Sequence, residues 1–151
     1  MKSLNLPTDM IPIWLEIARN EIGVKEIPGT GNNPRIIEYH ATTSLKATQD
    51  SVSWCSSFVN WCMKQVGIKG TGSAAARSWL GWGMTLDKPR LGCIVVFKRG
   101  APPSGHVALC DHEDISNGII RVVNGNMSDA VQISRLSVNG VLGYRWPRNI
   151  A

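Results

Sequence analysis

The sequence predicts an α+β domain, because two kinds of periodicity follow one another along the chain. Up to about residue 80, apolar residues recur at the three- and four-residue spacing of amphipathic helices. From residue 93 onward, short apolar runs alternate with Gly, Pro, Asn and Asp, which is typical of an antiparallel sheet. A chain of 151 residues has the length of one domain with one core, so we expect a single domain over residues 1–151.

Four helices are expected in the first half of the chain. In the first of them Pro12 suits the first turn, where its missing N–H is not needed, and Gly23 marks the end. A polar loop over residues 42–52 separates the second helix from the third. The four helices are expected at residues 11–21, 36–40, 55–66 and 73–80.

The third helix is the most strongly patterned of the four. Its apolar residues recur at intervals of three and four, which places them on one face. Ser53 is expected to cap the first turn and Gly67 to end the helix. The apolar face consists of Cys55, Phe58, Val59, Cys62, Met63 and Val66. Cys55 is therefore expected at the first turn of an amphipathic helix.

The second half of the chain contains five short apolar runs with turn residues between them. They cover residues 93–97, 107–110, 119–123, 131–133 and 143–146. Runs of this length and spacing are typical of antiparallel strands. Since the helices come first and the strands second, the order favours α+β over an alternating α/β fold.

The chain is basic, with 16 Lys and Arg against 11 Asp and Glu, a net charge of +5 and a pI near 9.3. This charge favours an anionic partner, which could be nucleic acid, a membrane surface or an acidic cell-wall polymer. The basic residues are scattered without a run of four, so a nucleic-acid site is not expected. The hydrophobic fraction of 43% excludes a disordered chain.

The sequence also bears on where the chain acts. Residues 1–10 lack the continuous apolar core of a secretory signal, and no segment approaches the roughly 18 apolar residues of a membrane span. We expect a protein made and kept in the cytoplasm unless another device exports it, monomeric and without a membrane span. No cofactor or metal is expected, because neither a C-x-x-C pair nor an H-E-x-x-H helix is present.

Cys55 and His106 have the residue types and setting for nucleophilic catalysis. A helix N-terminus lowers the pKa of a thiol from its free value of roughly 8.5, and the thiolate is the nucleophile. His106, in an apolar strand about fifty residues downstream, is the candidate base. Asn124 and Asn126 share one face of the next strand, so either could orient the imidazole. The backbone N–H of Cys55 is placed to stabilise an oxyanion.

Other side chains near these positions have two interpretations. Trp54 and Trp82 suit either the core or the wall of a cleft beside Cys55, where an indole ring could stack on a sugar or a peptide plane. Asp50 lies five residues before Cys55 and is a further candidate for substrate binding.

The remaining cysteines and histidines are expected to have no catalytic role. Cys62, Cys93 and Cys110 fit the apolar core, where most unpaired cysteines lie. His40 and His112 lie in polar surroundings and are expected to be solvated.

The candidate residues belong to longer motifs with a resemblance to a known group of enzymes. In chain order they include Trp54-Cys55-Ser56-Ser57-Phe58-Val59-Asn60-Trp61, Pro89-Arg90-Leu91-Gly92-Cys93-Ile94-Val95-Val96-Phe97, Gly105-His106-Val107, Asn124-Gly125-Asn126 and Gly143-Tyr144-Arg145-Trp146-Pro147. These motifs resemble the CHAP and NlpC/P60 superfamily of cysteine peptidases, in particular its small phage and prophage lysins. The similarity spans residues 14–147.

The resemblance implies a papain-like α+β fold, with the nucleophile at a helix N-terminus packed on an antiparallel sheet that carries the histidine. It implies cleavage of an amide bond of peptidoglycan through a cysteine acyl-enzyme, as an endopeptidase or amidase. Cys55 matches the nucleophile and His106 the base. Asn124 or Asn126 matches the third position, where many relatives have Glu.

The implied biological role is that of a phage or prophage endolysin, which acts in the cell wall or periplasm after holin-type release. Three alternatives stay open at this point. The chain could be a peptidoglycan-degrading toxin delivered by a secretion system, or a catalytically silent cell-wall-binding module on the same fold. A transferase that passes the acyl group to an amine would use the same residues.

Overall fold

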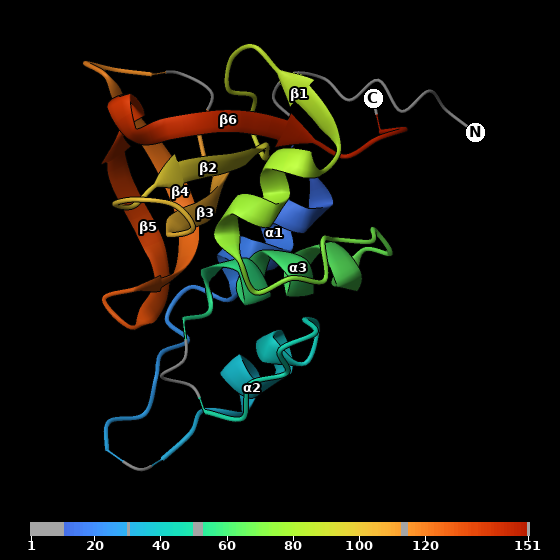
Figure 1. The fold of residues 1–151 in the computed structure, drawn as a ribbon, viewed down its shortest axis with the longest axis vertical. Helices are drawn as coiled ribbons and strands as arrows, with labels where there is room; N and C mark the ends of the chain where they lie inside the picture. Colours follow the sequence, from blue (N-terminus) through green and yellow to red (C-terminus); the bar gives the residue numbers. More distant parts are fainter. Residues whose placement is uncertain (1–10, 30, 50–52, 113–114, 151) are drawn as a thin grey trace.

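Helices occupy the first half of the chain and strands the second, which confirms the predicted α+β class (Figure 1). The computed structural model describes residues 11–29, 31–49, 53–112 and 115–150. The helices are α1 (Ile13–Asn20), α2 (Pro34–His40), α3 (Cys55–Gln65) and the 3-10 helices η1 (Ala76–Gly81) and η2 (Val138–Gly140). The strands are β1 (Met84–Leu86), β2 (Ile94–Lys98), β3 (Gly105–Cys110), β4 (Ile119–Met127), β5 (Ala130–Ser137) and β6 (Val141–Trp146).

The strands form one sheet of order β1-β6-β2-β3-β4-β5, with neighbouring strands antiparallel. Strand β3 lies inside the sheet between β2 and β4. From His106 to Cys110 every residue of β3 is buried, so both faces of this strand are covered. His106 is thus carried by an interior strand rather than by a loop.

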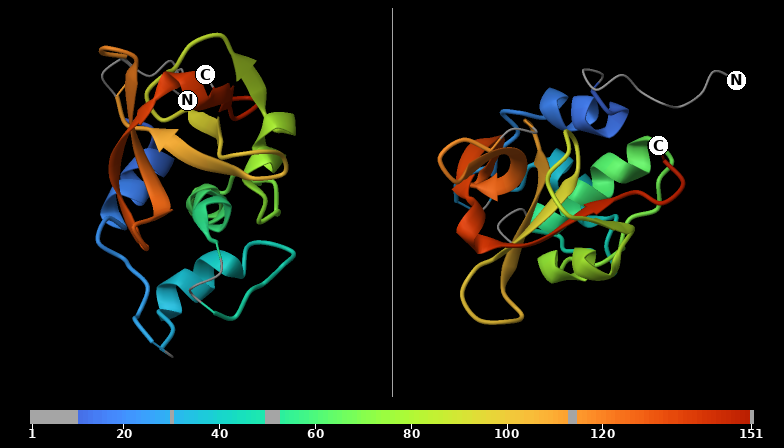
Figure 2. Two further views of the ribbon diagram at one scale, coloured as in Figure 1. Left: turned by 60° about the vertical axis from the view of Figure 1, so that its left-hand side comes forward. Right: turned by 90° about the horizontal axis from the view of Figure 1, so that it is seen from above.

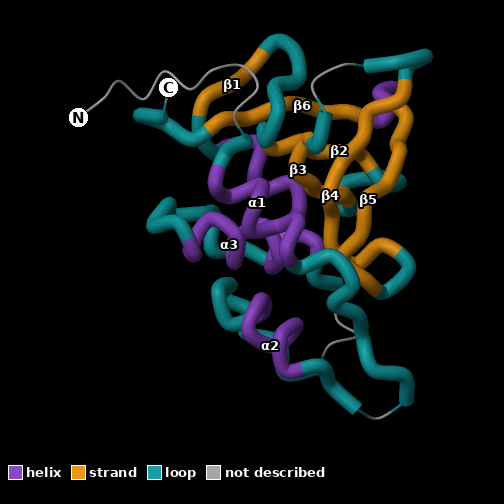
Figure 3. The backbone as a smooth tube through the Cα atoms, turned by 180° about the vertical axis from the view of Figure 1, so that it is seen from behind, coloured by secondary structure: helices purple, strands orange, loops and turns teal. Residues whose placement is uncertain are grey.

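Helix α3 is the central helix of the molecule. Figure 2 shows it end on between the sheet and α2, and Figure 3 shows the helices gathered beside the strands. It contacts α1, α2, β3 and β4, and the residues from Cys55 to Met63 are all buried. A helix buried on all sides needs small or uncharged residues around its whole circumference, which Ser56, Ser57 and Asn60 supply.

Several local expectations need correction. Trp54, not Ser53, is the N-cap of α3, because the helix begins at Cys55. The short helix expected over residues 73–80 is the 3-10 helix η1, which begins three residues later, and β1 was not expected at all. None of the helices described in the structure is long and apolar enough to cross a bilayer.

Candidate active site

Cys55 occupies the first position of α3, where backbone N–H groups have no intrahelical acceptor. The N-cap Trp54 makes no side-chain capping bond, so the helix start keeps these donors. The Cys55 side chain is 3% exposed. These surroundings suit a nucleophilic sulfur, because the free N–H groups can stabilise the oxyanion that forms when the sulfur attacks a carbonyl.

Trp54 lies in the core rather than in a cleft wall. Its side chain is completely buried, and its Nε1 donates to Glu26 Oε2 at 2.8 Å. A Cβ on Gly125 would lie 2.6 Å from the Trp54 ring, so only glycine allows β4 to approach the start of α3 this closely. The role of Trp54 is therefore to fix the helix start against the strand that carries Asn124.

Hydrogen bonds from Ser56 hold the other side of the helix start. The Ser56 Oγ donates to the carbonyl of Ser73 at 2.7 Å and accepts from Trp79 Nε1 at 2.9 Å. One turn later, Asn60 Oδ1 accepts from the backbone N–H of Gly72 at 2.9 Å. The segment after α3 is thereby tied to the turn that carries Cys55.

His106 is hydrogen bonded to Asn124 and not to Asn126. The His106 Nε2 lies 2.7 Å from Asn124 Oδ1, and both side chains are buried. The Asn124 Nδ2 donates to the carbonyl of Gln132 at 2.9 Å and to Ser134 Oγ at 3.1 Å. Since that carbonyl can only accept, the network assigns the amide orientation and leaves Oδ1 facing the imidazole.

This orientation determines the tautomer of His106. Because Asn124 Oδ1 accepts, Nε2 carries the hydrogen of the neutral ring and Nδ1 carries the lone pair. Nδ1 is buried and has no hydrogen-bond partner within the described part of the chain. A buried acceptor without a partner is rare, and here it belongs to the candidate base.

Cys55 begins the helix that packs on the strand of His106, since α3 contacts both β3 and β4. The backbone of Val107, the residue after His106, lowers the pKa of the Cys55 thiol, as do the backbone groups of Ser56 and of Cys55 itself. Phe97 is the register partner of His106 on β2, with ring centroids 6.1 Å apart. The candidate nucleophile and the candidate base therefore lie on two elements that pack against each other, α3 and β3.

Burial dominates the ionisation of both groups. It raises the pKa of the Cys55 thiol, while the backbone of Val107 and the charge of Arg99 oppose the rise. Burial lowers the pKa of His106 to about 4, with the Asn124 hydrogen bond opposing and the charge of Arg99 adding to the decrease. The backbone groups at the helix start lower the thiol pKa as expected, but burial outweighs them, so the net pKa of Cys55 is raised.

The other candidate residues that the structure describes have hydrogen-bond partners other than Cys55 and His106. Asn126 has a left-handed backbone with φ 60°, and its Nδ2 donates to Ser53 Oγ at 3.3 Å. Trp82 packs edge-on against Trp79 and donates to the carbonyl of Lys69 at 3.0 Å. It lines a pocket of about 490 Å³ beyond the C-terminal end of α3, opposite the end that carries Cys55. Asp50 lies outside the described residues.

His40 is a buried histidine that the sequence patterns misplace. It is completely buried rather than solvated, and its Nδ1 lies 3.1 Å from Ser57 Oγ on α3. The sequence contained one indication of this burial, because His40 lies at the end of a short helix that has an apolar face. Over the described residues, no cluster of three or more His, Cys, Asp or Glu side chains is arranged to hold a metal ion.

Comparison with solved structures supports the papain-like fold. The endolysin LysIME-EF1 has a TM-score of 0.61 and 12% identity over 91% of this chain and 65% of that chain. A protein similar to a lipoprotein of the NLP/P60 family, from Staphylococcus aureus subsp. aureus Mu50, has a TM-score of 0.55 and 15% identity over 91% of this chain and 41% of that one. The chain thus spans less than two thirds of either relative.

Sequence comparison identifies the family. No curated protein matches the sequence significantly. The profile of the CHAP domain matches residues 47–126, which is more than half of the 151-residue chain and includes Cys55, His106 and Asn124. The chain belongs to the CHAP domain family.

Proposed function

We propose that the chain is a cysteine hydrolase that cleaves an amide bond of the peptide part of peptidoglycan. The observation that carries this proposal is the buried Nδ1 of His106, which has no partner among the described residues while Asn124 accepts from Nε2, on a strand packed against the helix that Cys55 begins. The CHAP profile and the structural similarity to an endolysin support a cell-wall substrate.

Acylation begins from a neutral pair. The Cys55 thiol gives its proton to Nδ1 of His106, and the sulfur attacks the amide carbonyl, so an S–C bond forms as the carbonyl oxygen becomes an oxyanion. The backbone N–H of Cys55 at the start of α3 donates to that oxyanion. The Nε2–H bond to Asn124 stabilises the imidazolium, because it raises the pKa of His106.

Collapse of the intermediate breaks the C–N bond. Imidazolium Nδ1 returns the proton to the leaving amine, and a thioester to Cys55 remains. A water molecule then gives a proton to Nδ1, its oxygen attacks the thioester, and the thiol leaves with that proton. One amide and one water thus yield one amine and one carboxylic acid. Because both groups are nearly buried, substrate binding must first expose the sulfur.

The biological role that we propose is that of a phage or prophage endolysin. Its support is the similarity in fold to LysIME-EF1, whose name identifies it as an endolysin. The positive net charge of +5 would assist contact with anionic wall polymers. A gene for a holin beside this one is the expected genomic context, whereas a neighbouring immunity gene would favour a delivered toxin.

Purified sacculi provide the direct test. Wild type is expected to lower the turbidity of a sacculus suspension, and Cys55→Ala is expected to leave it unchanged while unfolding at the same temperature. Mass spectrometry of the released muropeptides identifies the bond. Equal lysis by the two proteins would refute the cysteine mechanism, and binding without lysis by wild type would favour a silent wall-binding module.

A further inference from the structure

Arg99 lies at the edge of the candidate active site. The register of β2 and β3 pairs Phe97 with His106 and Lys98 with Gly105, so Arg99 is the first loop residue beyond the strand pair that carries the base. Figure 2 shows this loop extending beyond the sheet. Arg99 is exposed, as expected for a residue at the rim of a site rather than in its support.

No carboxylate among the described residues forms an ion pair with this arginine. In the described chain, the arginines paired with carboxylates are Arg19, Arg35 and Arg121, and Arg99 has neither an ion pair nor a side-chain hydrogen bond. The neighbouring Arg77 differs, because its Nε donates to the carbonyl of Ser104 just before β3. Arg77 therefore supports the loop, whereas the five N–H donors of Arg99 are available to a ligand.

The charge of Arg99 acts on both reacting groups. It favours the thiolate of Cys55 and disfavours protonation of His106, in agreement with its place two residues beyond Phe97, the register partner of His106. A planar guanidinium binds a carboxylate through two parallel hydrogen bonds. A substrate carboxylate bound at Arg99 would thus lie next to the substrate carbonyl that Cys55 attacks.

We propose that Arg99 binds a carboxylate of the substrate next to the scissile amide, so that the enzyme selects acidic peptide stems over stems in which this group is amidated. The proposal rests on the proposed function for its substrate, but the charge at the site is measurable without any hydrolysis. The two parts therefore have separate experiments.

The first experiment compares alkylation of Cys55 by iodoacetate, which carries a carboxylate, and by neutral iodoacetamide. Labelling at Cys55 is quantified by peptide mass spectrometry, because the chain has three other cysteines. The ratio of the iodoacetate rate constant to the iodoacetamide rate constant is expected to fall about fivefold in Arg99→Gln and to fall less in Arg99→Lys. A change of this size is expected when one partly screened charge is lost.

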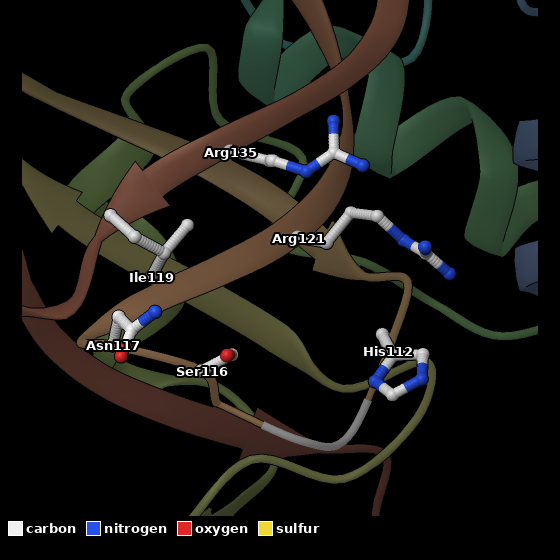
Figure 4. Close-up of a pocket in the computed structure, with 6 residues that line it drawn as sticks. All are labelled: His112, Ser116, Asn117, Ile119, Arg121 and Arg135. Carbon is white, nitrogen blue, oxygen red and sulfur yellow. The ribbon is translucent and has the colours of Figure 1, made fainter.

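Arg135 provides a matched control. It is also exposed and has no carboxylate partner within the part of the chain that the structure describes. It lies opposite Arg121 in the β4–β5 register and lines a separate pocket of about 370 Å³ (Figure 4). Its charge is not among the causes that shift the pKa of Cys55 or His106. The iodoacetate to iodoacetamide ratio of Arg135→Gln should equal that of wild type. An unchanged ratio in Arg99→Gln would overturn the proposal.

The second experiment uses pairs of stem peptides that differ only in a free or amidated carboxylate beside the scissile bond. Wild type is expected to prefer the free acid about tenfold in kcat/KM, mainly through KM, and Arg99→Gln is expected to lose this preference. Hydrolysis of both peptides at equal kcat/KM by wild type would overturn the inference alone. Absence of any hydrolysis by wild type would instead refute the proposed function.

Discussion

The bond between Asn124 and His106 gives the sharpest test of the proposed mechanism. In Asn124→Ala the acceptor 2.7 Å from His106 Nε2 is lost, and a buried N–H is left unsatisfied. An unsatisfied buried donor costs about 1–3 kcal/mol. The ring escapes this cost by turning or by moving its hydrogen to Nδ1, and either change removes the base from Cys55. A loss of about 1–3 kcal/mol in the transition state corresponds to a fall in kcat/KM of about 5- to 150-fold.

The assay is hydrolysis of sacculi at several pH values, with thermal unfolding of each variant as a check on folding. Because the Asn124 bond raises the pKa of His106, its removal should also move the acid limb of the pH profile below that of wild type. Asn126→Gly is the matched control, since Asn126 contacts Ser53 and glycine tolerates its φ of 60°. It should retain activity.

Two outcomes would refute this reasoning. Full activity of a folded Asn124→Ala would show that the bond does not position the base. A loss confined to Asn126→Gly would assign the orienting role to the other asparagine.

Two further predictions concern stability. From pH 7 to pH 4 the free energy of unfolding of wild type should fall by about 3 kcal/mol more than that of His106→Gln. The reason is that the unfolded histidine binds a proton near pH 6.5 and the folded one only near pH 4. Equal falls for the two proteins in urea titrations would contradict the lowered pKa. Gly125→Ala should lower the free energy of unfolding by about 1–3 kcal/mol, because the added Cβ clashes with Trp54. Gly81→Ala should be nearly neutral, since nothing lies within 4 Å of the added Cβ. Equal melting temperatures of the two variants would show that β4 can shift away from the helix.

The sequence patterns predicted the helices and strands that contain long apolar runs. Helices α1, α2 and α3 and strands β2 to β6 lie where periodicity indicated, because burial on a core selects the same spacing that reveals it. Strand β1 escaped notice because it is short, lies at the sheet edge and has two exposed residues of three. The 3-10 geometry of η1 is likewise not encoded in apolar spacing.

The choice between Asn124 and Asn126 could not be made from strand alternation. Two residues at i and i+2 share a face only in a regular strand, and β4 has an irregular register between Asn124 and Met127. At that irregularity Asn126 turns to a left-handed conformation and its side chain reaches Ser53. Tertiary pairing with β5, which no local pattern contains, decides which amide contacts His106.

The roles of Trp54 and Trp82 depended on the partners of their indole N–H groups. Both side chains have one apolar body and one donor, so the same residue type suits a core or a binding cleft. Trp54 finds its acceptor in Glu26, some 28 residues away, and Trp82 finds a backbone carbonyl at Lys69. Such acceptors are supplied by distant segments, and a single window of sequence cannot identify them.

The ionisation of Cys55 illustrates how the same position can carry opposing effects. Its location at a helix start favours the thiolate, and the surrounding core favours the thiol by a larger amount. A neutral resting pair protects the sulfur from unwanted reactions, since the thiolate is the nucleophile. Proton transfer to His106 then becomes favourable when donors at the start of α3 stabilise the oxyanion and the imidazolium keeps its bond to Asn124. Reactivity is thus expected to develop during substrate attack rather than in the free enzyme, and it depends on the same burial that hides the pair.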